Sequence, residues 1–187
     1  MYARLIGETY DAKRSNFGDF QFKGSYGDFE NPVINYYRKR DIDVFAIRGT
    51  KDFNDLVEDL EIARESLIGF EGRLVRNKIE GMEKYILSKR RRDSDGNFNP
   101  IVLVGHSLGS IEMNKIVEGG NVGDIDTAIG YGHTSNLPIH KDVFRMYSYE
   151  NDPLHIPMVE ESYRVIKKKT KKGADRFERY HSIQNYY

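Results

Sequence analysis

The stretch IVLVGHSLGS, residues 101–110, holds the residue types best suited to chemistry. Ser107 stands between two glycines, after an apolar run and before a helical pattern. Such glycines allow a sharp turn and a close approach of helix and strand. A serine there lies at a helix N-terminus, where N–H groups and the helix dipole favour developing negative charge. The pattern predicts a nucleophile, with the Leu108 amide as an oxyanion donor. The alternative is a serine that only caps the helix.

A nucleophilic serine needs a base, and the base needs an acid to orient it. In hydrolases with this turn the chain order is serine, acid, histidine. Asp152 follows the apolar pattern of residues 143–150 and is the candidate acid, although Asn-Asp-Pro is also strong turn chemistry. His155 follows Asp152 too closely to swing back over Ser107, so His181 is the candidate base. The alternative for His181 is a solvated histidine in a polar segment.

Strands and helices must position these side chains. Along the sequence, strand patterns alternate with helical patterns. Short apolar runs predict strands at 43–50, 101–105, 125–132 and 143–150. Helical spacing predicts helices at 1–17 and 107–117, and a third along the stripe Val75, Ile79, Met82 and Ile86. Residues 17–32 read as a loop with an edge strand. We therefore expect one α/β domain over residues 1–187, with a mostly parallel sheet flanked by helices.

Composition excludes several classes of site. The chain has 187 residues with no cysteine, so disulfides, thiolate zinc sites and cysteine nucleophiles are ruled out. Lys and Arg together count 29, as do Asp and Glu, which gives a net charge of zero. No overall field therefore favours nucleic acids or membranes, and only local patches could attract them.

Two basic runs are such patches. One spans residues 89–92, and the other consists of Lys167, Lys168, Lys169, Lys171 and Lys172. Either run could bind anionic lipid headgroups or phosphates. The alternative is a solvated loop. Nucleic acid is not an expected partner, because the aromatic residues are not interleaved with these runs.

The N-terminal residues lack the apolar core of a secretory signal, and no run reaches the roughly 20 apolar residues of a membrane span. We therefore expect a cytoplasmic location, in a cellular or viral setting, with leaderless release left open.

Three segments together resemble the class 3, or fungal-type, triacylglycerol lipases of the α/β-hydrolase fold. RGTKDFNDLVEDL at 48–60 is similar to the family's oxyanion segment, and IVLVGHSLGS to its serine turn. YSYENDPLHIP at 147–157 is similar to the acid loop. HSIQNYY at the C-terminus is a weaker match to the histidine segment. The segments stand in the family's order over residues 44–187.

The resemblance implies a compact α/β-hydrolase that cleaves carboxylic esters of lipids, or small esters, through an acyl-enzyme. It assigns Ser107 as nucleophile, Asp152 as acid and His181 as base. Thr50 would supply an oxyanion N–H beside that of Leu108. The reaction needs neither a metal nor a cofactor.

Departures from the family pattern bear on the substrate. Leu56 stands where the family prefers tryptophan, and Ser110 replaces the second glycine after the serine turn. Asp59 matches a second acidic position that we expect to be structural. Residues 52–62 occupy the place of the family's lid, yet we expect an ordinary packed helix there. Two other functions stay open: thioester or peptide hydrolysis on the same triad, and a catalytically silent module that binds anionic membranes.

Overall fold

Seven strands and three helices make up the regular structure of the residues that the computed structural model describes, which are 1–30, 32–49, 73–132, 142–149 and 163–166. The helices are α1 (Tyr2–Tyr10), α3 (Arg73–Lys89) and α4 (Leu108–Gly119). The strands are β1 (Gln21–Gly27), β2 (Pro32–Lys39), β3 (Ile42–Ile47), β4 (Ile101–His106), β5 (Thr127–Tyr131), β6 (Phe144–Tyr149) and β7 (Tyr163–Ile166).

The strands form one sheet in the order β1-β2-β3-β4-β5-β6-β7. The neighbouring pairs from β3 to β7 are parallel, whereas β1 pairs with β2, and β2 with β3, in antiparallel orientation. Parallel neighbours need a crossover connection, and helices supply it between β3 and β4 and between β4 and β5. The predicted fold class is confirmed: the protein has an α/β-hydrolase-like fold with a mostly parallel sheet.

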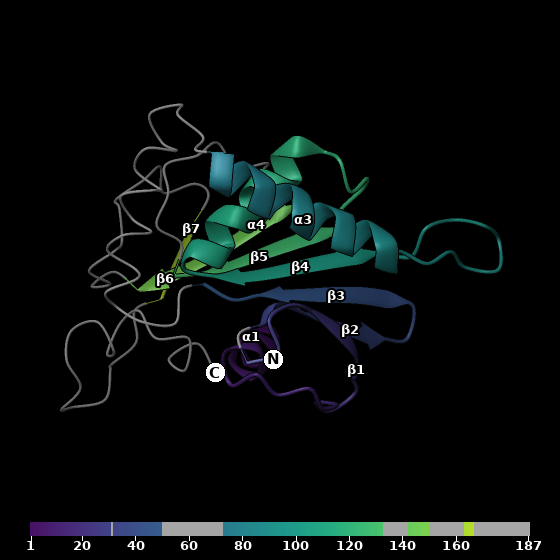
Figure 1. Ribbon diagram of the computed structural model, residues 1–187, viewed down its shortest axis with the longest axis horizontal. Coiled ribbons are helices and arrows are strands. Elements are labelled where there is room, and N and C mark those ends of the chain that lie inside the picture. Colours follow the sequence, from purple (N-terminus) through teal and green to yellow (C-terminus); the bar gives the residue numbers. More distant parts are fainter. Residues whose placement is uncertain (31, 50–72, 133–141, 150–162, 167–187) are drawn as a thin grey trace.

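Helices cover both faces of the sheet. Figure 1 shows α3 and α4 side by side on one face and α1 on the opposite face. The larger apolar core lies under α3 and α4 and includes Phe45, Leu103 and Met113, all fully buried. A second core lies under α1 and includes Leu5 and Ile6. Burial of each such side chain contributes about 1.5–3 kcal/mol, so all three helices are firmly packed on the sheet.

The predicted helices are present with different bounds. The first was expected over residues 1–17 but ends at Tyr10, where the Asp11 amide bonds back to the Gly7 carbonyl at 3.0 Å. In α3, Met82 and Ile86 of the predicted stripe are fully buried, and Ile79 packs against the same core. No helix among the described residues combines the length and the apolar character that crossing a bilayer demands.

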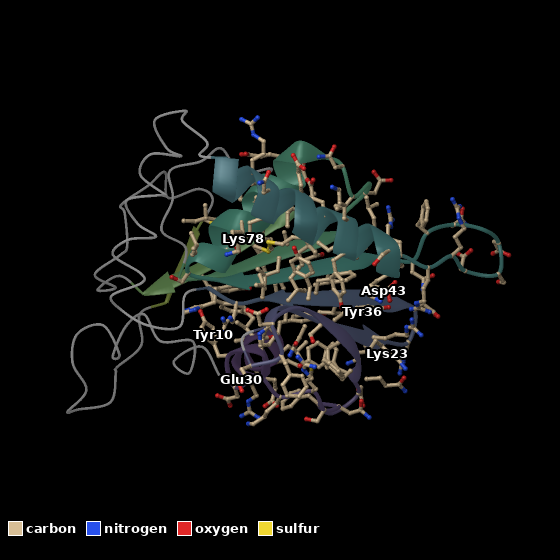
Figure 2. The ribbon with its side chains drawn as sticks, viewed as in Figure 1. Tyr10, Lys23, Glu30, Tyr36, Asp43 and Lys78 are labelled. Carbon is tan, nitrogen blue, oxygen red and sulfur yellow. The ribbon has the colours of Figure 1, made fainter. Side chains whose placement is uncertain are left out.

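An ion pair joins the two helices that cover the larger core. Lys78 of α3 contacts the carboxylate of Glu112 in α4, and the Glu112 side chain is 6% exposed. Lys78 points from α3 towards α4 in Figure 2. The Lys78 side chain is 41% exposed, so removal of Lys78 is the costly change, because it leaves the buried Glu112 carboxylate without this partner. The pair therefore helps to hold α4, and the turn that precedes it, in place.

The strand β2 was missed by the sequence patterns. It is rich in β-branched and aromatic residues and mostly buried. A two-residue turn at Arg40 and Asp41 joins it to β3, with Lys39 paired to Ile42. Arg40 has φ of 54°, a conformation that this turn requires and that Asn or Gly usually provides. The edge strand expected within residues 17–32 is β1.

The carboxyl ends of the parallel strands meet at one edge of the sheet. Gly105 pairs with Ile47 of β3, and His106 with Tyr131 of β5, which in turn pairs with Tyr147 of β6. Open α/β sheets build their sites at this edge.

Asp43 and Tyr36 lie at the opposite end. Figure 2 shows these two side chains together at one end of the sheet and Tyr10 towards the other.

Candidate active site

Ser107 has an unusual backbone conformation at the turn between β4 and α4. Its φ is 54° and its ψ is −128°, a region that residues other than glycine rarely occupy. Such a conformation costs about 1–3 kcal/mol and persists only where the surroundings impose it. Here the Ser107 amide donates to the carbonyl of Tyr131 in β5 at 2.9 Å. The predicted sharp turn between strand and helix is therefore present.

The Ser107 side chain does not cap the helix. The residue precedes the first residue of α4, and its carbonyl accepts from the Ser110 amide at 2.9 Å, but its side chain makes no capping hydrogen bond. A capping serine has an extended backbone and accepts from the amides of the first turn. The helix-capping alternative is therefore wrong for this side chain.

The two flanking glycines are required by close backbone contacts. A Cβ at Gly105 would lie 2.6 Å from the carbonyl oxygen of Gly109, and one at Gly109 would lie 2.6 Å from that of Arg48. Backbone atoms cannot yield as side chains can, so neither position tolerates alanine without a shift. The predicted close approach of helix and strand is confirmed, and it extends to the end of β3.

Ser110, which departs from the family pattern, fits because of a glycine opposite it. Its side chain is fully buried against β5. A Cβ at Gly130 would collide with the Ser110 hydroxyl, so the missing side chain on the strand leaves room for the serine on the helix. The departure is thus accommodated locally.

Of the two predicted oxyanion donors, Leu108 and Thr50, only Leu108 lies among the described residues. Leu108 is the first residue of α4, so its N–H belongs to the helix N-terminus, where donors lack an intrahelical acceptor. Thr50 lies outside the described residues. Gly49, directly before it, is buried against the serine turn: a Cβ there would lie 2.9 Å from the Ser107 Cβ and 2.5 Å from the His106 carbonyl oxygen.

The candidate acid and base, Asp152 and His181, lie outside the described residues, as does His155. The strand before Asp152 is present as β6. Because β6 is parallel to β5, it runs towards the edge of the sheet that carries Ser107. The assignments of acid and base stay predictions from the sequence.

A tyrosine from α1 joins the site, and the sequence patterns gave it no role beyond packing. The Tyr10 hydroxyl accepts a hydrogen bond from the Gly49 amide at 2.9 Å and lies 2.9 Å from Nδ1 of His106. The two rings meet edge to face with centroids 5.7 Å apart. Burial raises the pKa of Tyr10 well above its ordinary value, so the hydroxyl stays protonated.

The basic run at 89–92 makes contacts within the protein. Arg90 donates to the carbonyl of Val122 at 2.8 Å. The guanidinium groups of Arg90 and Arg92 lie 4.1 and 3.8 Å from the ring centroid of Phe98. The run begins at Lys89, the last residue of α3, and precedes β4, so it lies at the end of the sheet away from Ser107. These contacts favour a structural role over phosphate binding. The lysine run at 167–172 lies outside the described residues.

The described part of the site thus combines a buried serine on a strained turn, the N-terminus of α4 and a neighbouring histidine. Among the described residues, no cluster of three or more His, Cys, Asp or Glu side chains could hold a metal ion. The arrangement suits nucleophilic chemistry on the edge of an α/β-hydrolase-like sheet.

Known proteins match this chain in structure but not in sequence. No protein-family profile matches it, and no curated protein does. The lipase of Rhizopus microsporus var. chinensis has a TM-score of 0.52 at 12% identity, with 90% of this chain and 73% of that chain covered. The native Rhizomucor miehei lipase propeptide complex has a TM-score of 0.50 at 12% identity, with 82% of this chain covered. Lip2 lipase from Yarrowia lipolytica has a TM-score of 0.47 at 13% identity, with 82% and 70% covered.

The similarities to the Rhizopus and Rhizomucor structures, with TM-scores of 0.52 and 0.50, establish a lipase-like fold. The chain spans 60% of the length of the Rhizomucor protein. The resemblance expected from short motifs is therefore supported at the level of the fold.

Proposed function

We propose that this protein is a serine hydrolase that cleaves carboxylic esters, with Ser107 as its nucleophile. The observation that carries the proposal is the backbone of Ser107, held at φ 54° and ψ −128° between β4 and α4. A strained serine at a strand-to-helix turn is the arrangement that exposes a nucleophile at the top of an α/β-hydrolase sheet.

Acylation would begin when His181, oriented by Asp152, accepts the Ser107 hydroxyl proton. The serine oxygen then attacks the ester carbonyl carbon and forms a tetrahedral intermediate. The amides of Leu108 and Thr50 would donate to its oxyanion, and one such donor contributes about 3 kcal/mol in other hydrolases. Collapse expels the alcohol, which takes the proton from His181, and leaves the acyl group on Ser107.

Deacylation repeats these steps with water as the nucleophile. His181 accepts a proton from water, the hydroxide attacks the acyl carbonyl, and Ser107 leaves with the proton returned by His181. The carboxylic acid is released and the enzyme is regenerated.

The proposed substrates are esters of lipids or of shorter acids. The similar structures are of lipases, which favours a lipid ester. The chain spans 60% and 73% of the lengths of the Rhizomucor and Rhizopus proteins, so the acyl length it accepts is part of the proposal and not carried over from them. Thioesters and peptides are alternatives that the same three side chains could cleave, and a substrate panel distinguishes them.

An anionic membrane as partner stays a prediction for the lysine run, Lys167, Lys168, Lys169, Lys171 and Lys172. The contacts of the described basic run at 89–92 lend it no support. Salt-sensitive binding to anionic vesicles without any hydrolysis would favour the silent module over the enzyme.

Labelling with a fluorophosphonate tests the nucleophile directly. An activated serine displaces fluoride and forms a stable oxygen–phosphorus bond, which mass spectrometry locates on a peptide. We expect the label on Ser107 in the wild type and no label in Ser107→Ala. Ser88→Ala, which removes an exposed hydroxyl of α3, is the matched control and should label like the wild type. Equal labelling of Ser107→Ala, or none of the wild type, would contradict the proposal.

A further inference from the structure

The Tyr10 hydroxyl connects three separate parts of the chain. Tyr10 is the last residue of α1. Its hydroxyl oxygen accepts a hydrogen bond from the Gly49 amide, just beyond β3, at 2.9 Å, and lies 2.9 Å from Nδ1 of His106 at the end of β4. A hydroxyl carries one proton and two acceptor sites. Since the Gly49 N–H occupies an acceptor site, the Tyr10 proton is free to point at Nδ1 of His106. That direction requires Nδ1 to be unprotonated, with the ring proton on Nε2.

Both partners of this hydroxyl are in direct contact with the serine turn. Gly49 has no room for a Cβ, because the Ser107 Cβ and the His106 carbonyl fill that space. His106 is the residue immediately before Ser107 and is itself 5% exposed. A shift of the Gly49 backbone would therefore displace Ser107 or open a gap beside it.

The helix that carries Tyr10 is a rigid support. Leu5 and Ile6 are fully buried in the core that α1 forms with the sheet. The Thr9 hydroxyl bonds to the Leu5 carbonyl at 3.0 Å within the helix. A side chain on so well packed an element can hold a neighbouring backbone segment in one place.

We propose that Tyr10 is a positioning residue for ester hydrolysis: its hydroxyl holds the Gly49 backbone against Ser107 and fixes His106 as the tautomer protonated on Nε2. This inference depends on the proposed function. Tyr10 acts through Gly49 and His106 and need not touch the substrate. Its raised pKa argues against a role as a base, since it does not ionise near neutral pH.

A small shift of Gly49 should matter because an oxyanion site works only when its hydrogen-bond donors are placed within narrow distance limits. Its donors must lie about 2.7–3.1 Å from the oxyanion. Misplacement of a catalytic group by about 1 Å can lower the rate about a hundredfold. Gly49 immediately precedes Thr50, the residue that the lipase resemblance assigns as a donor. Loss of the Tyr10 hydroxyl should thus weaken stabilisation of the transition state more than binding of the ester.

The test compares Tyr10→Phe with Tyr37→Phe. The control also removes a hydroxyl from the core under α1, one that accepts from Asn35 at 3.3 Å. We expect Tyr10→Phe to lower kcat about ten- to a hundredfold with KM changed less than about threefold. Its affinity for a boronic acid transition-state analogue should fall by a similar factor. Tyr37→Phe should keep kcat within about twofold of the wild type.

Ser107→Ala separates the failure of this inference from that of the function. If Ser107→Ala is inactive and Tyr10→Phe turns over like the wild type, the positioning role is wrong and the proposed function stands. If Ser107→Ala is fully active, the proposed function itself fails.

A measurement on the wild type keeps the inference testable should Tyr10→Phe not fold. Nitrogen-15 NMR of the histidine side chains reports which ring nitrogen carries the proton. We expect His106 with its proton on Nε2 and with Nδ1 as an acceptor. A neutral His106 ring with its proton on Nδ1 would overturn the inference.

Discussion

Arg91 donates two hydrogen bonds to a single oxygen of Asp43, from Nε at 3.1 Å and from Nη2 at 3.0 Å. The Asp43 side chain is 1% exposed, and Tyr36 donates to the same oxygen at 2.7 Å. Asp43 lies near the start of β3, whereas Ser107 follows the end of β4. The contact therefore fastens the segment after α3 to the end of the sheet opposite the candidate site.

Replacing Asp43 should lower the free energy of unfolding and leave kcat unchanged. Asp43→Asn removes the charge that compensates Arg91, which leaves a partly buried guanidinium without its counterion. We expect the free energy of unfolding to fall by about 2–3 kcal/mol, below the usual cost for a fully buried pair because Arg91 is partly exposed. Urea denaturation measures this change.

The control for Asp43→Asn is Asp124→Asn, which alters an exposed carboxylate near β5 and should leave stability almost unchanged. The value of kcat for folded Asp43→Asn should equal that of the wild type. A tenfold loss of kcat at unchanged stability would mean that this end of the sheet takes part in the reaction.

Gly109 should not tolerate alanine. Its Cβ would lie 2.6 Å from the Arg48 carbonyl oxygen, a backbone atom that cannot rotate away. We expect Gly109→Ala to destabilise the protein by about 1–3 kcal/mol and to disturb the serine turn enough to lower kcat. Thermal unfolding and ester hydrolysis measure the two effects.

Gly119 in the same helix is the matched position. A Cβ there meets only the ends of the Glu83 and Asn121 side chains, at 3.1 and 3.4 Å. Gly119→Ala should therefore be neutral, or stabilising by up to about 1 kcal/mol. Equal effects of the two substitutions would show that the close contact at Gly109 does not matter.

The choice of base predicts a difference between two histidines. His181→Ala should lower kcat by about a thousandfold or more, as loss of the base does in related triads. His155→Ala should cost less than about tenfold. Steady-state hydrolysis by both variants decides between them, and the reverse order would make His155 the base.

Alkaline pH should destabilise the protein through its buried tyrosines. Burial raises the pKa of Tyr37 and of Tyr131 to about 12, from an ordinary value of 10.0. The folded state therefore holds these protons more tightly than the unfolded state. Their contribution is fully present below pH 10 and is lost as the pH rises towards 12.

Urea denaturation between pH 9 and pH 12 measures this loss. Tyr37→Phe removes one of the titrating groups, so its stability should fall less steeply than that of the wild type, by about 1–2 kcal/mol over the range. Identical curves for the two proteins would contradict the raised pKa of Tyr37.

Local patterns were enough to predict the parts of the fold that bring Ser107 to the edge of the sheet. The apolar run of β4, the glycines around Ser107 and the helical spacing of α4 all lie within residues 101–119. Each reflects a periodicity or a turn that neighbouring residues impose on one another. The stripe of α3 was predicted for the same reason.

Features that depend on distant contacts were not predicted. Tyr10 and His106 are separated by 96 positions, and helical spacing alone cannot show where a tyrosine hydroxyl will point. The strand β2 was missed because its turn, at Arg40 and Asp41, lacks the Asn-Gly or Asp-Gly signal of a tight hairpin.

The most direct test of the account is hydrolysis of p-nitrophenyl esters, from acetate to palmitate, by the wild type and Ser107→Ala. The account predicts turnover by the wild type and a loss of about a thousandfold or more in the variant, with an unchanged circular dichroism spectrum and melting temperature. The acyl length that gives the highest kcat/KM would separate an esterase from a lipase. Equal turnover by the two proteins would show that Ser107 is not the nucleophile.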